Sequence, residues 1–220
     1  MEQYTIANMY DLTQTLAGEY LKGFKYPWEA LAGIGDMIVA LGNALDPDEY
    51  DKVGENVWIA KSAKVAPTAS INGPAIIGKE AEVRHCAFIR GKALVGEGAV
   101  VGNSTELKNV ILFNKVQVPH YNYVGDSVLG FKSHMGAGSI TSNVKADKTL
   151  VTVHGDEEID TGLKKFGAML GDNVEVGCNS VLNPGTVIGP KSNVYPCSMV
   201  RGCIPANSIY KKKGEIAEKY

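Results

Sequence analysis

The chain has 220 residues, with 22 lysines and arginines against 24 aspartates and glutamates, and a net charge of −2. This length suits one domain with a sizeable core and a short appendage, and the charge balance excludes a basic surface for nucleic acid or an anionic membrane. Hydrophobic residues make up 45% and charged residues 21%, as in ordinary globular proteins, whereas 25 glycines are an excess. We therefore expect a folded domain rich in turns that acts on small molecules or on protein partners.

The first 50 residues, 1–50, are expected to form an N-terminal helical segment. Apolar residues recur at helical spacing between positions 28 and 45, and Pro27 suits the first turn of such a helix. A shorter helix, with Leu12, Leu16 and Tyr20 along one face, is expected after Asp11. These helices are expected to cap the end of the repeat region described next, because an open edge of β-structure invites pairing.

An internal repeat dominates residues 51–208. Apolar residues occupy every sixth position in one phase, and the same period returns later in the chain: Val53, Ile59, Val65, Ile71, Ile77, Val83, Ile89, Val95, Val101, Leu107 and Phe113, then Leu170, Val176, Leu182, Ile188, Val194 and Val200. A period of six indicates one short strand and one corner per unit, so that three units close a triangular coil of about 18 residues. The residue after the apolar one is often Gly, which we expect where the backbone bends. A β-sandwich is the alternative, but its variable loops would lose the phase.

Two segments depart from this period. Residues 144–166 are too long for a corner, and their alternating pattern predicts a hairpin loop that projects from the solenoid; long loops in compact domains are usually functional. Residues 209–220 are expected to be a C-terminal tail.

The four cysteines are sparse and follow no C-x-x-C spacing: Cys86, Cys178, Cys197 and Cys203. The N-terminus lacks a basic and then apolar signal pattern, and the longest apolar run is too short to span a bilayer. We interpret the cysteines as reduced thiols in a cytoplasmic protein.

Arg90 and Lys108 are 18 residues apart and should occupy the same corner in successive coils, about 4.8 Å apart along the stack. Two like charges in this arrangement repel unless an anion lies between them. A phosphate site and two solvated surface cations are both compatible with the spacing. Lys148, on the projecting loop, is a candidate third cation.

His120 lies in the run VPHYNYVGD, where the six-residue period slips by one. A neutral imidazole can accept a proton from an amine or a hydroxyl near neutral pH, so His120 is a candidate general base; for His85, His134 and His154 a surface or packed role is the simpler interpretation. A zinc site between subunits, as in the gamma-class carbonic anhydrases, would need a further His at the position of Gly125, so we predict no metal.

The run GNSTELKN…VPHYNYVGDSVLGFKSHMGAGSITSNV, residues 102–144, resembles the acetyltransferase half of the bifunctional glucosamine-1-phosphate acetyltransferase / N-acetylglucosamine-1-phosphate uridyltransferase enzymes. The runs TGLKKFGAMLGDN and YPWEAL are similar to archaeal-type relatives and to the linker in that family. The resemblance implies a left-handed parallel β-helix, a homotrimer with active sites between subunits, and acetyl-CoA as the acyl donor with no metal required.

The resemblance also assigns roles to individual positions. His120 matches the general base that deprotonates the sugar amine, and Asn143 matches an amide near the amine and the acetyl group. Arg90, Lys108 and Lys148 match the cations that hold the phosphate of an amino sugar phosphate, and Tyr123 matches a substrate hydroxyl contact. For the cofactor, Ala137 matches a backbone contact in the turn 136–138.

Two further residues are candidates at the cofactor. Cys178 falls where cofactor contacts are expected, although a small buried thiol is the simpler interpretation. Lys211 either reaches the cofactor's phosphates or belongs to a solvated terminus.

Two positions depart from the family pattern. The family's Asn before the turn is His134 here, a candidate substrate contact that puts the acceptor sugar in doubt, and a Tyr after the matched Asn is Val144. The chain also has no Gly-rich phosphate loop of a nucleotidyltransferase. We therefore expect an acetyl-CoA-dependent N-acetyltransferase acting on a glucosamine-1-phosphate-like amino sugar phosphate. The alternative is a non-catalytic β-helix that binds a sugar nucleotide or partners a separate nucleotidyltransferase.

Overall fold

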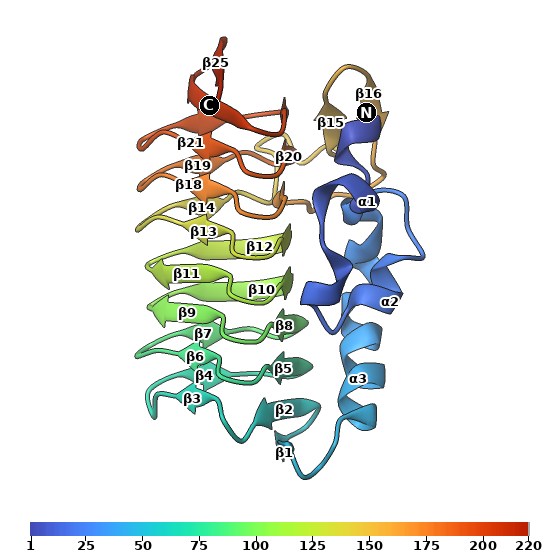
Figure 1. Ribbon diagram of the computed structural model, residues 1–220, viewed down its shortest axis with the longest axis vertical. Helices are drawn as coiled ribbons and strands as arrows, with labels where there is room; N and C mark the ends of the chain where they lie inside the picture. The colour runs from blue at the N-terminus through green and yellow to red at the C-terminus, as the bar shows by residue number, and fades with distance from the viewer. Residues whose placement is uncertain (220) are drawn as a thin grey trace.

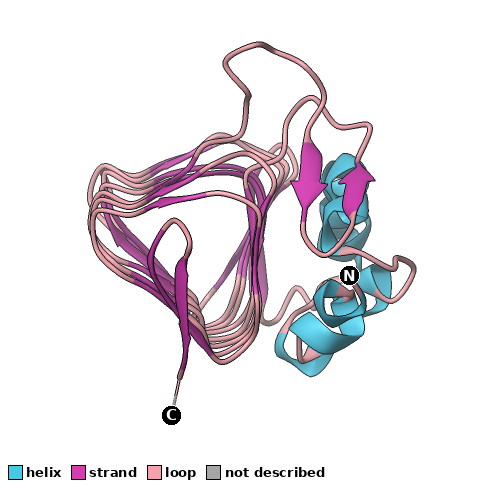
Figure 2. Cartoon of the chain, turned by 90° about the horizontal axis from the view of Figure 1, so that it is seen from above, coloured by secondary structure: helices cyan, strands magenta, loops and turns pink. Residues whose placement is uncertain are grey.

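The computed structural model describes residues 1–219, which form a parallel β-solenoid with a helical layer along one side (Figure 1). Seen along its axis the solenoid is triangular, and the helices cover one of its three faces (Figure 2). None of the helices in residues 1–219 combines the length and the apolar character that a bilayer crossing needs.

Three faces, here numbered one to three in the order in which the chain enters them, make up the solenoid. Face one holds β2 (Val57–Ala60), β5 (Ala75–Ile77), β8 (Ala93–Val95), the later parts of β10 (Glu106–Leu112) and β12 (Tyr123–Leu129), β17 (Ala168–Leu170), β20 (Thr186–Ile188) and β23 (Cys203–Ile204). Face two holds β3 (Lys64–Val65), β6 (Glu82–Val83), β9 (Val100–Asn103), β11 (Gln117–His120), β13 (His134–Met135), β18 (Glu175–Val176), β21 (Asn193–Val194) and β24 (Ser208–Lys212). Face three holds β4 (Ser70–Ile71), β7 (Phe88–Ile89), the first residues of β10 and β12, β14 (Ile140–Thr141), β19 (Val181–Leu182) and β22 (Met199–Val200).

The strand register confirms the predicted coils. Ile77 pairs with Val95, a coil of 18 residues, whereas Val101 pairs with Val118 in a coil of 17. Of the predicted inward residues, those from Ile77 onward are buried, while the earlier ones are half-buried or, for Val53, 59% exposed. Val53 lies in β1 (Tyr50–Gly54), which pairs antiparallel with β2 and precedes the first coil. Phe113 does not belong to the inward row either. Leu112, one residue earlier, pairs with the inward residue Val95 and takes that place.

The glycines after the inward residues have a different role from the predicted one. At the corner between faces two and three the left-handed conformation falls on other residues, mostly not glycine: Cys86, Ser104, Tyr121, Gly138, Asn179 and Cys197. At Gly102 a Cβ atom would lie 1.6 Å from the Pro119 carbonyl oxygen of the next coil, and at Gly96 it would lie 2.5 Å from the Phe113 carbonyl carbon. These glycines are therefore required by the close approach of stacked backbones rather than by a bend.

The helical layer lies along face one and does not cap the end of the solenoid, as the sequence had suggested (Figures 1 and 2). Face one carries a row of apolar side chains that point out of the solenoid and are fully buried: Ile76, Leu94, Ile111, Val128, Met169 and Val187. Burial of these apolar side chains away from water is favourable, so the helices pack against this row. The solenoid ends instead in antiparallel hairpins, β1 with β2 and β24 with β25 (Glu215–Glu218). Residues 209–219 of the predicted tail therefore contribute strands, and residue 220 lies outside the described residues.

The helices differ in detail from the predicted ones. The longer one starts as a 3-10 helix, η3 (Pro27–Gly33), and continues as α3 (Ile34–Ala44). The predicted short helix does not form: the segment contains η2 (Leu12–Gln14) and α2 (Gly18–Leu21), after η1 (Glu2–Tyr4) and α1 (Ile6–Met9). Leu16 is 43% exposed whereas Leu21 is fully buried, because the break turns the chain and moves the buried side away from the expected face.

The projecting segment forms the hairpin of β15 (Thr152–His154) and β16 (Glu158–Asp160). It leaves the solenoid after face three and returns at face one. Its return is anchored by Phe166, which is fully buried and stacks on Trp28 of η3 with 5.8 Å between ring centroids. The hairpin is therefore held over the corner between faces three and one.

Candidate functional site

Arg90 and Lys108 occupy the same corner in successive coils, between faces three and one. The Arg90 backbone N–H donates to the Leu107 carbonyl oxygen at 2.8 Å, so Arg90 is one coil below Lys108, as the spacing predicted. Each cation, however, has a carboxylate of its own. Arg90 Nη1 is 2.8 Å from Glu106 Oε1, and Lys108 Nζ is 2.9 Å from Asp126 Oδ1. The two cations therefore need no external anion to offset their repulsion.

Asp126, which the sequence analysis did not single out, is the centre of this corner. Asp126 sits at the corner with a φ of 48°, a left-handed conformation that Asp tolerates. Its carboxylate accepts hydrogen bonds from Lys108 Nζ, from Asn109 Nδ2 at 2.9 Å and from Asn143 Nδ2. The corner thus holds a buried carboxylate fully engaged by one cation and two amides.

Tyr123 and Asn143 extend the cluster along face three. Asn143 Nδ2 also donates to the Tyr123 hydroxyl oxygen at 3.2 Å. Burial, and after it the negative charges of Asp126 and Glu106, raise the pKa of Tyr123, so its phenol stays protonated at neutral pH. Arg90, Lys108, Tyr123 and Asn143 are therefore neighbours at one edge of face three. Lys148 is exposed in the turn that starts the hairpin loop, and Lys145 rather than Lys148 lines the groove at its base.

His120 stands at the opposite edge of face three, where β11 ends. Its side chain is exposed, and its carbonyl oxygen accepts the Gly138 N–H of the next coil at 3.0 Å. Ala137 is therefore directly above His120, and Cys178 above Ala137, whose carbonyl oxygen accepts the Asn179 N–H. Within residues 1–219 the Ala137 backbone N–H has no acceptor, which leaves it available to a ligand. The simpler interpretation of Cys178 as a buried thiol is wrong, because Cys178 is exposed.

Lys211 lies in β24 near the same corner, nearer the C-terminal end. Its position follows Tyr210, whose carbonyl oxygen accepts the Tyr195 N–H, and its Nζ is 3.7 Å from Glu215 Oε1. Ala137 and Cys178 thus lie in successive coils above His120, whereas Lys211 lies a further two coils up and one residue out of their register.

His134 does not join either group within one chain. It begins β13 on face two, one coil above Gln117, and its Nδ1 is 2.8 Å from Glu175 Oε2. Lys115, Lys132 and Glu175 line the same shallow groove. Among residues 1–219 no cluster of three or more His, Cys, Asp or Glu side chains is arranged to hold a metal ion.

A family model described as the GMPPB C-terminal domain matches residues 71–204. The bifunctional protein GlmU of Methanococcus aeolicus is 38% identical over 54% of this chain and 29% of its own length. The bifunctional protein GlmU of Methanococcus maripaludis (strain S2) is 31% identical over 91% of this chain and 50% of its own length. The chain therefore spans half or less of the length of these curated relatives. Among solved structures, a hexapeptide transferase family protein from Anaplasma phagocytophilum has a TM-score of 0.42 and 18% identity, over 74% of this chain and 80% of that chain.

The six-residue period and the stacked parallel coils define the chain as a hexapeptide-repeat β-solenoid. More particularly, it belongs to the GMPPB C-terminal domain family, whose model covers most of the solenoid.

Proposed function

We propose that this chain is an acetyl-CoA-dependent N-acetyltransferase whose acceptor is an amino sugar phosphate similar to glucosamine-1-phosphate. The observation that carries the proposal is the arrangement along face three. One edge presents an exposed imidazole, His120, below the free N–H of Ala137, and the other presents the Lys108, Asp126 and Asn143 cluster. A base, an oxyanion donor and a polar acceptor site are the parts that acyl transfer to an amine needs.

The chemistry assigned to these residues is a single displacement in two steps. The nitrogen of the neutral sugar amine attacks the thioester carbonyl carbon and forms the C–N bond, and the His120 imidazole takes the proton that this nitrogen loses. The Ala137 N–H stabilises the negative charge that develops on the carbonyl oxygen. The C–S bond then breaks, and the leaving thiolate takes up the proton. Acetyl-CoA is the acyl donor in this scheme and supplies the activated acetyl group.

The acceptor is assigned to the cluster at the far edge of face three. Asn143 and Tyr123 are positioned to contact a sugar hydroxyl or amine, and Arg90, Lys108 and Lys148 are the proposed contacts of its phosphate. Because one face separates His120 from this cluster, we propose a homotrimer in which a neighbouring subunit brings the two edges together. Two observations favour this arrangement: helices cover only face one, and large apolar side chains are exposed at or beside face three, with Tyr121 at 64% and Met199 at 62%.

Measurement of thiol release from acetyl-CoA, in the presence of glucosamine-1-phosphate or galactosamine-1-phosphate, tests this function. His120→Ala should lower the rate by about 100- to 10,000-fold, the usual contribution of a general base. His85→Ala is the matched control, because His85 lies in the same corner two coils below and should leave the rate unchanged. Equal rates for the wild type and His120→Ala would remove His120 as the base.

The second candidate function is a non-catalytic β-helix that binds a sugar nucleotide or partners a nucleotidyltransferase. The carboxylates that neutralise Arg90 and Lys108, and the Glu175 partner of His134, favour it because they occupy groups assigned to the acceptor. Binding of a sugar nucleotide or copurification with such an enzyme, without turnover of any amino sugar, would support this second function.

A further inference from the structure

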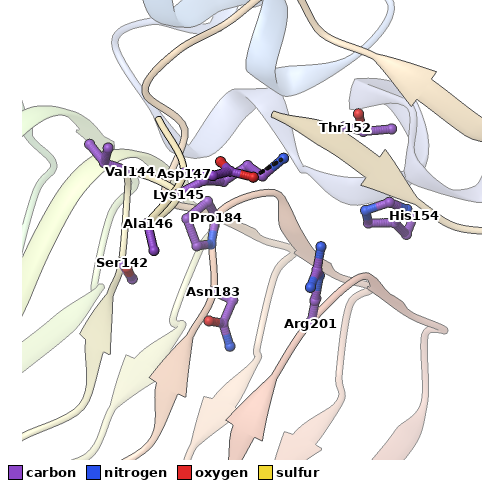
Figure 3. Close-up of a pocket in the computed structure, with 10 residues that line it drawn as sticks. All are labelled: Ser142, Val144, Lys145, Ala146, Asp147, Thr152, His154, Asn183, Pro184 and Arg201. Carbon is purple, nitrogen blue, oxygen red and sulfur yellow. Dashed lines mark ion pairs between the residues drawn. The ribbon is translucent and has the colours of Figure 1, made fainter. Parts of the chain in front are cut away.

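A groove of about 510 Å³ lies beneath the hairpin, at the corner between faces three and one (Figure 3). Its walls come from the solenoid and from the hairpin loop: Ser142, Val144, Lys145, Ala146, Asp147, Thr152, His154, Asn183, Pro184 and Arg201. The hairpin closes one side tightly, since the His154 carbonyl oxygen lies 2.8 Å from where a Cβ on Gly202 would be. The groove is thus made by two segments far apart in the sequence.

Arg201 continues upward the row of outward positions that contains Arg90 and Lys108. In this row Lys108 pairs with Gly125 of the next coil. Higher up, the Ser142 N–H donates to the Leu182 carbonyl oxygen, which places Asn183 above Ser142. In the same way the Asn183 N–H donates to the Val200 carbonyl oxygen, which places Arg201 above Asn183. Arg201 is therefore two coils, or about 10 Å, above Ser142. Because Asn143 is the next residue after Ser142, the groove begins beside the proposed acceptor site.

Arg201 differs from the other arginines of the chain in its partners. Arg84 Nη2 is 3.1 Å from Glu82, and Arg90 Nη1 is 2.8 Å from Glu106. Among residues 1–219, no carboxylate lies within 4 Å of the Arg201 guanidinium. Asp147, which lines the groove, faces Lys145 at 3.8 Å, and Glu158 lies 3.0 Å from Nδ1 of the lining residue His154. In Figure 3 the Arg201 side chain rises between Asn183 and His154, below the Lys145–Asp147 pair.

The side chains of this groove match an anion with several oxygens. A guanidinium offers a planar fork of N–H donors that suits phosphate. On the opposite wall Lys145 contributes a positive charge, although its Nζ already donates to Thr149 Oγ1 at 2.6 Å. Asn183 is held in place by its Nδ2 bond to the Val200 carbonyl oxygen at 2.9 Å. We propose that the hairpin groove is a phosphate-ester-binding site built around Arg201, distinct from the positions of Arg90 and Lys108.

Two ligands could supply this phosphate: an amino sugar phosphate, or coenzyme A through its phosphate groups. The assignment of either one rests on the proposed function, whereas the anion site itself does not. Isothermal titration calorimetry of the full chain, without turnover, should therefore use glucosamine-1-phosphate, coenzyme A and inorganic phosphate, with unphosphorylated glucosamine as the neutral probe. Acetyl transfer is measured separately, so that the loss of one conclusion does not remove the other.

Substitutions of Arg201 test whether its guanidinium binds the phosphate. Arg201→Gln should weaken binding of at least one phosphate ligand about 10- to 100-fold, the effect of losing a charge-assisted bidentate contact, and Arg201→Lys should weaken it less. Arg84→Gln removes a carboxylate-paired arginine beside face two and should leave the affinity unchanged. The phosphate ligand whose affinity falls identifies the source.

Three results would overturn the proposal: no binding of any phosphate ligand, equal affinities in the wild type and Arg201→Gln, or equal binding of glucosamine. Far-ultraviolet circular dichroism verifies that each variant is folded. Binding that depends on Arg201 without any acetyl transfer would keep the groove and reject the enzymatic function.

Discussion

Lys108 and Asp126 form an ion pair of 2.9 Å in which the carboxylate side chain is 5% exposed and the lysine side chain is 26% exposed. The pair is thus half inside the corner, with Asn109 and Asn143 completing the contacts of the carboxylate. Asp126 holds the side chains of Lys108 and Asn143, which the proposed acceptor would contact. In the proposed function it would therefore be a positioning residue rather than a catalytic one.

Asp126→Asn should both destabilise the protein and impair the proposed acetyl transfer. An amide leaves the Lys108 charge unpaired and offers one acceptor oxygen in place of two, so we expect a loss of about 2 kcal/mol in the free energy of unfolding. The Michaelis constant for the sugar should rise, because Asn143 loses its anchor. Urea unfolding at fixed protein concentration and steady-state kinetics measure the two effects.

Glu106→Gln is the control for this prediction. It breaks the Arg90 pair, in which the arginine side chain is 46% exposed, and because solvent screens an exposed ion pair the loss of stability should be clearly smaller than in Asp126→Asn. An equal loss of stability in both variants would mean that the burial of Asp126 contributes nothing.

Gly102→Ala should be among the most destabilising substitutions of a single methyl group in the solenoid. The added Cβ would lie 1.6 Å from the Pro119 carbonyl oxygen, so adjacent coils would have to separate. We expect a loss of about 3 kcal/mol or more, of the order found for overpacked cores. Gly54→Ala is the matched control, since its Cβ would meet only Val57 at 3.8 Å. Thermal unfolding of both variants decides the point, and similar midpoints would contradict it.

The solenoid could be predicted from the sequence because every coil repeats the same local rule. One aliphatic side chain per six residues points inward, and stacking in register follows from that spacing. The position of the helices could not be predicted in this way. It depends on the outward apolar row of face one, and residues such as Ile76 and Leu94 lie beside inward residues in continuous apolar runs that a six-residue period does not separate.

The candidate site was predictable only where the fixed repeat spacing relates its residues to one another. The spacing of 18 residues placed Arg90 below Lys108, but spacing contains no information about the carboxylates that pair with them. Asp126 was missed because its corner lies in a coil of 17 residues, outside the fixed phase. Arg201 was missed because the hairpin insertion lies between it and Lys108, and the register across that insertion is visible only in the folded chain.

Asp172 should give the stability a defined dependence on pH. Its carboxylate accepts the N–H groups of Asp11 and Phe131, both at 2.7 Å, and so ties the N-terminal segment to the solenoid. Burial nevertheless raises the pKa of Asp172 above its ordinary value of 3.8. The folded state therefore retains a proton that the unfolded chain has lost, and the stabilisation from this group declines as the pH rises through the folded pKa.

The comparison of wild type with Asp172→Asn isolates this effect. The difference in the free energy of unfolding, wild type minus variant, should fall as the pH rises above the ordinary carboxyl pKa of 3.8, as measured by urea titrations at several pH values. A difference that rises with pH would show that the two N–H contacts outweigh burial and lower the pKa.

Cys203 should be the least reactive of the four thiols. Burial, followed by the charge of Asp156, raises its pKa to about 12, while Cys86, Cys178 and Cys197 are exposed. Because the thiolate is the reactive form, a pKa near 12 leaves about one molecule in 10,000 ionised at pH 8, against roughly one in four at the ordinary pKa of 8.5. Alkylation by iodoacetamide at pH 8, followed by mass spectrometry, should label Cys203 last. Cys203→Ser should leave the number of rapidly labelled thiols unchanged, whereas loss of a fast-reacting thiol in this variant would place Cys203 at the surface.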